Sequence, residues 1–235
     1  WKIVTDWHIT EAMRVAIDPV TPSTIYTATA YGIFKSTDNG NSWVEKNNGL
    51  RSTYTSSLLA DRKIPHRLLT GTEEAPYISD DGGEHWRRYA SDSTINKAVL
   101  DIEQSESDPN VLMLATEKDE IWRSTDDGNY WTKTVNGLPD APWYSVAIDP
   151  MNASIAYAAG FKTGVWKTTD GGAHWSDVSG ELAKKSFHAL AVSKEHPNEV
   201  FAGEYDGGIW RSKGGGATWK FIGLAGSQVW QIVIQ

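Results

Sequence analysis

Four aspartates with matching neighbours are the residues of this sequence best suited by type to carry chemistry. Asp38, Asp81, Asp126 and Asp170 recur at intervals of 43 to 45 residues, each five residues before a tryptophan. Carboxylates can bind calcium or transfer protons, but calcium needs six or more oxygens at one point. One carboxylate per interval does not supply them, so we interpret these aspartates as structural groups and expect no metal site.

Each aspartate belongs to an eight-residue phrase that ends at the tryptophan. The phrases occupy residues 36–43, 79–86, 124–131, 168–175 and 212–219. An aspartate side chain can accept hydrogen bonds from backbone N–H groups one or two residues ahead, and the glycine that follows can take positive φ. The phrase is therefore typical of a tight turn. In the fifth phrase Gly214 replaces the aspartate, so we expect a looser turn there.

The tryptophans set the period of the whole chain. They recur every 42 to 45 residues, at Trp1, Trp43, Trp86, Trp131, Trp175 and Trp219. A period of about 40 to 50 residues made of short strands indicates a β-propeller with one blade per repeat. A large aromatic ring at one fixed place in each repeat suits packing between neighbouring sheets.

The elements between the tryptophans predict an all-β fold of four-stranded blades. We expect five complete blades, a leading outer strand at residues 1–4 and a trailing inner strand over residues 227–235, in a single domain over residues 1–235. Residues 181–190 have a helical pattern, but the repeat places them in a loop and an inner strand. Because exposed sheet edges are normally covered, we expect a larger ring of six or more blades, or edge pairing with another chain.

The overall composition argues against some classes of binding partner. The formal net charge of −8 argues against nucleic acid and against anionic membrane surfaces. No apolar run is long enough to span a bilayer, and the chain has no cysteine. Nothing in the sequence indicates a cofactor.

The five phrases resemble the Asp-box, or BNR repeat, with the pattern Ser/Thr-x-Asp-x-Gly-x-Thr/Ser-Trp. This repeat occurs in sialidases, xyloglucan-cleaving glycoside hydrolases, sortilin-type receptor ectodomains and photosystem II assembly factors. The resemblance covers essentially the whole chain and implies an extracytoplasmic location. In such propellers the inner strands line a central channel, and ligands bind at the channel mouth, on the face opposite the boxes.

Transferred to this chain, that plan gives a set of mouth residues. The side chains expected to contact a ligand, a glycan or a protein segment, are Arg14, Lys97, Tyr144, His188 and Trp230. The carboxylates expected there, which are weaker candidates for catalysis, are Glu73, Glu117 and Glu204. The alternatives are that the acidic loops are solvated turns and that His188 is a structural histidine.

The sequence favours binding over catalysis. Sialidases carry a Phe/Tyr-Arg-Ile-Pro segment ahead of their boxes, whereas the nearest match here, Asp61–Pro65, has an extra lysine and follows the first box. We therefore expect a non-enzymatic binding or interaction scaffold. The alternative is a glycoside hydrolase, sialidase-like or xyloglucanase-like, that acts through a pair of mouth carboxylates.

Overall fold

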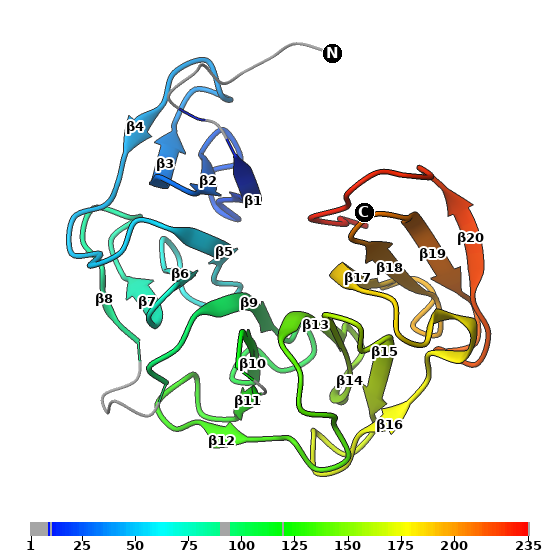
Figure 1. Cartoon of the computed structure of the whole chain (residues 1–235). Helices are drawn as coiled ribbons and strands as arrows, with labels where there is room; N and C mark the ends of the chain where they lie inside the picture. Colours follow the sequence, from blue (N-terminus) through cyan, green and yellow to red (C-terminus); the bar gives the residue numbers. More distant parts are fainter. Residues whose placement is uncertain (1–8, 10, 90–94, 119, 235) are drawn as a thin grey trace. The chain divides into compact units, whose positions relative to one another are not determined.

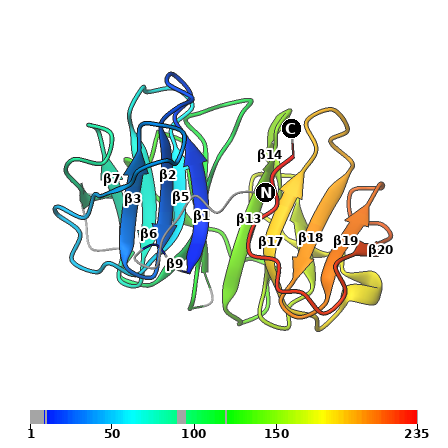
Figure 2. The ribbon, with the colours of Figure 1, turned by 90° about the horizontal axis from the view of Figure 1, so that it is seen from above.

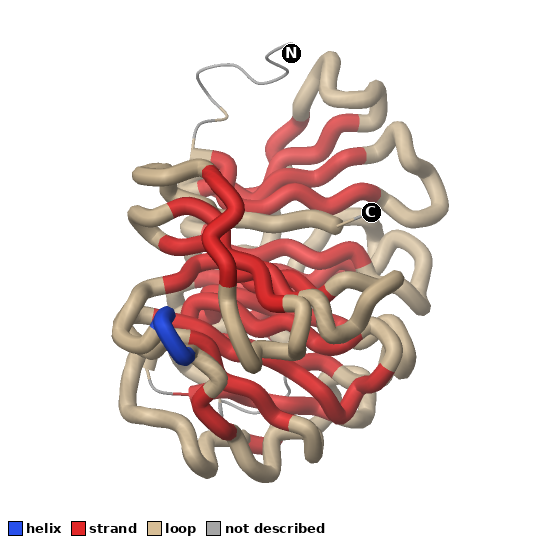
Figure 3. Tube along the Cα trace, turned by 90° about the vertical axis from the view of Figure 1, so that its right-hand side faces the viewer, coloured by secondary structure: helices blue, strands red, loops and turns tan. Residues whose placement is uncertain are grey.

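The computed structural model describes residues 9, 11–89, 95–118 and 120–234. Strands dominate it (Figure 3), and the helical segment among these residues is a short 3-10 helix at Gly180–Leu182. The chain divides into two compact units, Trp1–Ile102 and Glu103–Gln235, with the boundary inside strand β9. The all-β prediction is confirmed, and residues 187–190 lie in a strand, as the repeat required.

The first unit contains two complete sheets (Figure 1). The first is built from β1 (Ala12–Ile17), β2 (Ile25–Thr29), β3 (Gly32–Ser36) and β4 (Val44–Glu45). The second is built from β5 (Thr55–Ala60), β6 (Leu68–Thr72), β7 (Pro76–Ser79) and β8 (Arg87–Arg88). In both sheets the strands pair in chain order and antiparallel, which is the blade that the repeat predicted.

Three further sheets follow the same plan. The third contains β9 (Val99–Gln104), β10 (Leu112–Thr116), β11 (Glu120–Ser124) and β12 (Thr132–Lys133). The fourth contains β13 (Trp143–Asp149), β14 (Asn152–Gly160), β15 (Val165–Thr168) and β16 (Ser176–Asp177). The fifth contains β17 (Phe187–Val192), β18 (Val200–Glu204), β19 (Gly208–Ser212) and β20 (Lys220–Gly223). The five predicted blades are thus confirmed.

The box turns are held by a serine and an aspartate together. In the second box the Ser79 hydroxyl accepts a hydrogen bond from the N–H of Gly83 (2.9 Å) and donates to Asp81 (2.8 Å). The Asp81 carboxylate accepts from the N–H of His85 (2.9 Å), four residues ahead rather than the expected one or two. The reason is that Gly82 and Gly83 both have positive φ, 71° and 88°, and reverse the chain toward the carboxylate.

The fifth box keeps only part of this arrangement. Ser212 still accepts a hydrogen bond from the N–H of Gly216 (2.9 Å). Gly214 has no side chain, so the carboxylate bonds of the other boxes have no counterpart there. This agrees with the expectation of a less strongly tied turn.

Three of the box tryptophans pack between neighbouring sheets. Trp86 is 4% exposed, and its indole N–H donates to the carbonyl of Lys46 in the preceding sheet (2.8 Å). Within the second unit, Trp219 donates in the same way to the carbonyl of Val178 (2.8 Å). The rings of Trp86, Trp175 and Trp219 each join a hydrophobic cluster shared by two sheets. The predicted packing role of these tryptophans is confirmed.

The sequence predicts one further strand at each end of the chain. The expected leading strand at residues 1–4 lies outside the described residues. Residues 227–234 form no strand, although they run beside β17 (Figure 2), and the N–H of Val229 donates to the carbonyl of Glu204 in β18 (3.4 Å). The side chain of Val229 covers Gly203, as an inner strand would, but one long hydrogen bond does not make a ladder. Pairing with further blades or another chain stays a prediction.

Candidate functional site

Bulges at the start of the inner strands position the candidate side chains. In β13 and β17 the pairing register shifts between the first and third residues, so Tyr144 and His188 lie at the irregular second place. Met13 and Ser56 occupy that place in β1 and β5. A β-bulge leaves its extra residue out of the ladder and redirects the side chain. This local geometry is what turns Tyr144 and His188 away from the sheet interior.

The register corrects one predicted position. Strand β9 begins at Val99, so Lys97 precedes it, and Asp101 takes the third place that Arg14 has in β1. The prediction aligned the apolar run at residues 98–100 with the middle of the strand. In this strand the apolar run stands at the beginning, and the strand continues through the polar residues Asp101 and Glu103. Lys97 stays a candidate ligand contact only as a residue that precedes β9.

The candidates in the first unit already have partners. The Arg14 side chain is buried, and its Nη2 lies 3.6 Å from Oδ1 of Asp101. Its Nη1 donates to the carbonyl of Met13 (3.1 Å). Glu73 is exposed and accepts a hydrogen bond from the hydroxyl of Ser52 (2.8 Å). The structure therefore gives Arg14 a structural partner and leaves Glu73 at the surface of a loop.

The second unit brings Tyr144, His188 and Trp230 together. The ring of His188 stacks on Tyr144 with centroids 4.4 Å apart, and Trp230 meets His188 edge-on at 4.6 Å. Tyr205, from the loop between β18 and β19, completes the group at 4.9 Å from His188. We call these four residues the aromatic cluster. Their rings come from two inner strands, one loop and the C-terminal segment that runs beside β17 (Figure 2).

The aromatic cluster is partly open to solvent. Trp230 and Tyr205 are each 41% exposed, while Tyr144 and His188 are half-buried beneath them. Tyr205 was not among the contact residues expected from the sequence. The available signal was an aromatic side chain in the polar loop at residues 204–207, where a solvated turn has no need of one.

Burial and charge at the cluster oppose ionisation of Tyr144. Burial raises the pKa of Tyr144, and the negative charge of Glu117 raises it further. The negative charge of Glu117 thus acts on Tyr144, and its place at a channel mouth stays a prediction. A neutral phenol can donate and accept hydrogen bonds, but it is a poor nucleophile.

Glu204 is held by its own blade. One carboxylate oxygen accepts from Nζ of Lys185 (2.7 Å) and the other from the indole N–H of Trp210 (2.8 Å). Lys185 also lies over the Trp210 ring, 5.2 Å from its centroid. These contacts give Glu204 a structural role that its loop position had not indicated.

The described part of the chain lacks a metal-binding cluster and a membrane-spanning helix. No group of three or more histidine, aspartate or glutamate side chains there is placed to hold a metal ion. No helix in those same residues is long and apolar enough to cross a bilayer.

Comparison with known proteins places this fold. Residues 31–143, just under half of the chain, match the family model of sortilin, also described as neurotensin receptor 3. This match agrees with the five boxes and the five four-stranded blades. The chain is an Asp-box β-propeller.

Solved structures similar to this Asp-box propeller include GH74 enzymes and YCF48. An ancestral GH74 enzyme matches 93% of the chain at 20% identity with a TM-score of 0.76. The GH74 xyloglucanase from Xanthomonas campestris matches 92% of the chain at 18% identity with a TM-score of 0.67. YCF48 from Cyanidioschyzon merolae matches 93% of the chain at 12% identity with a TM-score of 0.60, and the match covers 87% of the YCF48 chain.

These similarities have clear limits. The Asp-box propeller spans 32% of the ancestral GH74 enzyme and 38% of the Xanthomonas enzyme. At such identities the likeness shows the fold alone. A comparison with curated protein sequences found no match.

Proposed function

We propose that this Asp-box propeller is a non-enzymatic binding module that takes a carbohydrate ligand on the aromatic cluster. The observation that carries the proposal is the grouping of four rings from separate elements, two of them 41% exposed. Aromatic faces bury the C–H faces of sugar rings, and the polar edges of tyrosine and tryptophan supply hydrogen bonds. Because the rings already pack on one another, little side-chain entropy is lost on binding.

The alternative, hydrolysis of a glycoside, has weaker support. It needs two carboxylates that flank the scissile bond, one of them able to exchange a proton. Both oxygens of Glu204 are engaged by Lys185 and Trp210. A tyrosine nucleophile would need a lowered pKa, whereas burial and Glu117 raise the pKa of Tyr144. The observation that keeps this alternative open is Glu117, a carboxylate whose negative charge acts on Tyr144.

The experiment is a glycan-array screen followed by calorimetry on the double variant Tyr205→Ala/Trp230→Ala. Both rings are substantially exposed, so we expect the melting temperature to change little and glycan binding to fall at least tenfold. Tyr130→Ala is the matched control, because Tyr130 is 70% exposed in a box loop away from the cluster. Unchanged binding in the double variant, or no glycan retained by the wild-type protein, contradicts the proposal.

A hydrolysis assay on the same glycans separates the two functions. Wild-type protein should release no product from a bound oligosaccharide. Product release that disappears in Glu117→Gln would establish the hydrolase instead.

We also propose that the protein acts outside the cytoplasm, as its resemblance to sortilin-type ectodomains and glycoside hydrolases implies. Fractionation of cells that produce the native protein tests this. Recovery only in the cytosolic fraction would contradict it.

A further inference from the structure

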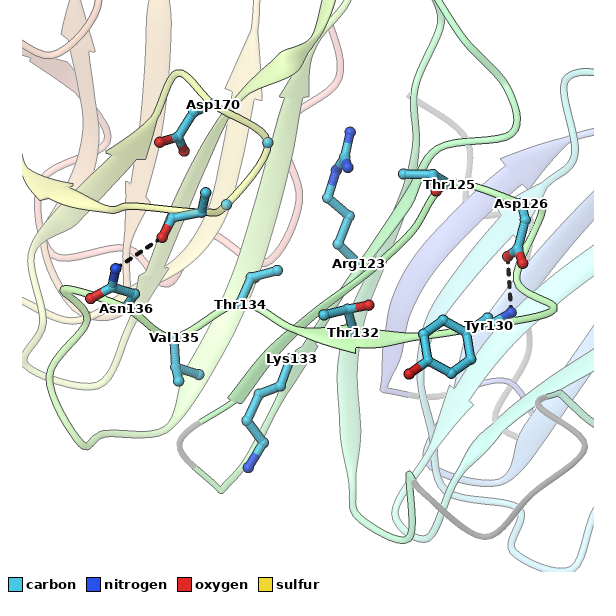
Figure 4. Close-up of a pocket in the computed structure, with 13 residues that line it drawn as sticks. Arg123, Thr125, Asp126, Tyr130, Thr132, Lys133, Thr134, Val135, Asn136 and Asp170 are labelled. Atoms are coloured by element: carbon cyan, nitrogen blue, oxygen red, sulfur yellow. Dashed lines mark hydrogen bonds between the residues drawn. The ribbon is translucent and has the colours of Figure 1, made fainter.

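A cavity of about 540 Å³ lies on the box side of the second unit, between the third and fourth sheets. Figure 4 shows Arg123, from β11, projecting between the loop of Asp170 and the loop of Thr125 and Asp126. Lys133 lines the cavity too, but its ammonium group pairs with Glu120. Of the two cationic side chains that line the cavity, Arg123 is therefore the one whose charge is not explained by an ion pair within the described part of the protein.

The corresponding place between the first and second sheets is filled by the protein itself. There Lys35 donates to the carbonyl of Gly82 (3.0 Å) and lies 5.5 Å from the centroid of the Tyr26 ring. The carboxylate of Glu84, in the second box, lies 3.7 Å from Lys35 and 2.6 Å from Lys46. At that junction the ammonium group of Lys35 thus lies near both an aromatic ring and a glutamate carboxylate.

Arg123 has the strand position of Lys35 but none of these partners. It pairs across the sheet with Met113, where Lys35 pairs with Tyr26. In the fourth box, which faces Arg123 across the cavity, Ala173 takes the place of Glu84, four residues after the Thr169 that corresponds to Asp80. Thr134 takes the place of Lys46, since each accepts the indole N–H of the next box tryptophan at its carbonyl. Thr134 and Ala173, both smaller than their counterparts, line the cavity.

The hydrogen bonds of Arg123 are correspondingly few. Its Nε is buried without a hydrogen-bond partner, and Nη2 makes one long bond, 3.5 Å, to the carbonyl of Ala153. Over the described residues it forms no ion pair within 4 Å. Burial lowers the pKa of Arg123, and the charge of Asp108 partly offsets this. A buried polar group left without a partner calls for an explanation, and an unmodified arginine remains charged.

The two box aspartates that line the cavity do not supply the missing carboxylate, because the box turns use them. Asp126 accepts from the Ser124 hydroxyl and the N–H of Tyr130. Asp170 accepts from the Thr168 hydroxyl, and His174 binds it through its backbone N–H and its ring. Gly171 packs close to the guanidinium, since a Cβ there would lie 3.1 Å from its central carbon. One side of the guanidinium is thus covered.

We propose that this cavity is a binding site for the glutamate side chain of an acidic peptide segment, held by Arg123. The glutamate side chain of the peptide would occupy the space beside Arg123 that corresponds to the place of Glu84 at the first junction. That space therefore suits a glutamate in size and charge. A guanidinium binds a carboxylate through two parallel hydrogen bonds, which compensates its loss of solvation. The site is separate from the aromatic cluster, so either proposal can fail without the other.

Binding is tested by calorimetry and by the arginine side-chain resonances in NMR spectra. The probes are the peptide acetyl-Gly-Glu-Gly-amide, its Gln counterpart and sodium acetate. We expect the Glu peptide to shift the Nε–Hε resonance of Arg123 and to bind at least tenfold more tightly than the other two. Equal binding of the Gln peptide overturns a carboxylate site, and equal binding of acetate overturns the peptide part of the proposal.

Two variants complete the test. Arg123→Gln should reduce affinity for the Glu peptide at least tenfold, whereas Lys167→Gln, at the equivalent place in β15, should leave it unchanged. Ala173→Glu should block the site from within and raise the melting temperature, because it restores the arrangement of Glu84. Ala173 is exposed, so this variant should fold even if Arg123→Gln does not. Undiminished peptide binding by folded Ala173→Glu overturns the proposal.

Discussion

The indole N–H of Trp175 donates a 3.0 Å hydrogen bond to the backbone carbonyl of Thr134, which lies in the preceding sheet. The ring is 4% exposed and belongs to a cluster with residues of β10, β13 and β14. One side chain thus links two blades by packing and by a directed bond.

Replacing Trp175 by alanine should therefore lower the free energy of unfolding by about 3–5 kcal/mol, as for other buried aromatic side chains. Trp175→Phe should cost less, because most of the packing remains and only the bond to Thr134 is lost. Denaturant unfolding measures both. Met151→Ala is the control, since Met151 is 62% exposed and should change stability by less than about 0.5 kcal/mol. A loss for Trp175→Ala no larger than the control would contradict the packing role.

The fifth box offers a test by addition. Gly214→Asp should supply the carboxylate that this turn lacks and raise the free energy of unfolding by about 0.5–2 kcal/mol, through new hydrogen bonds and a less flexible unfolded chain. The new Cβ would lie 3.3 Å from that of Ala217, and the fourth box already accommodates Asp170 with Ala173 at the same spacing. Thermal unfolding gives the result. A lower melting temperature would show that the turn rejects a side chain.

The boxes also predict how stability depends on pH. Hydrogen bonds from Ser42 lower the pKa of Asp38 to about 2, and those from His174 lower the pKa of Asp170 to about 2. Since an unfolded aspartate titrates near 3.9, the unfolded chain binds more protons between these values. The stabilisation is therefore complete above about pH 4 and is lost as the pH falls toward 2.

Urea unfolding at a series of pH values measures this slope. The double variant Asp38→Asn/Asp170→Asn should be less stable at neutral pH and should have a shallower decline between pH 4 and 2. A slope equal to that of the wild-type protein would mean that these carboxylates are not held in their charged form by the fold.

The two mouth glutamates of the second unit should respond differently to neutralisation. Glu204→Gln weakens the contacts to Lys185 and Trp210 and should lower stability by about 1 kcal/mol. Glu117→Gln, on an exposed loop residue, should leave stability within about 0.5 kcal/mol. Equal losses in the two variants would remove the distinction between an anchoring and a mouth carboxylate.

The sequence by itself determined the fold of each repeat. The spacing of Trp43, Trp86 and the later box tryptophans requires a repeating unit, and the positive-φ glycines of the boxes permit only a tight turn at one place in it. Such local and periodic signals do not depend on distant contacts. Tyr144, His188 and Trp230 could be grouped for the same reason, because equivalent places in successive repeats lie next to one another.

Only the tertiary structure decided which side chains have free functional groups. Lys97 misses its expected place because the apolar run of β9 lies at the start of the strand, and a shift of register changes which residue meets which neighbour. Glu204 turns to Lys185 and Trp210, and Tyr205 joins the aromatic cluster, through contacts between separate elements. The lack of partners around Arg123 depends on Met113, Thr134 and Ala173 together. Spacing along a chain specifies repeats, whereas a site depends on which neighbours fill the space around each side chain.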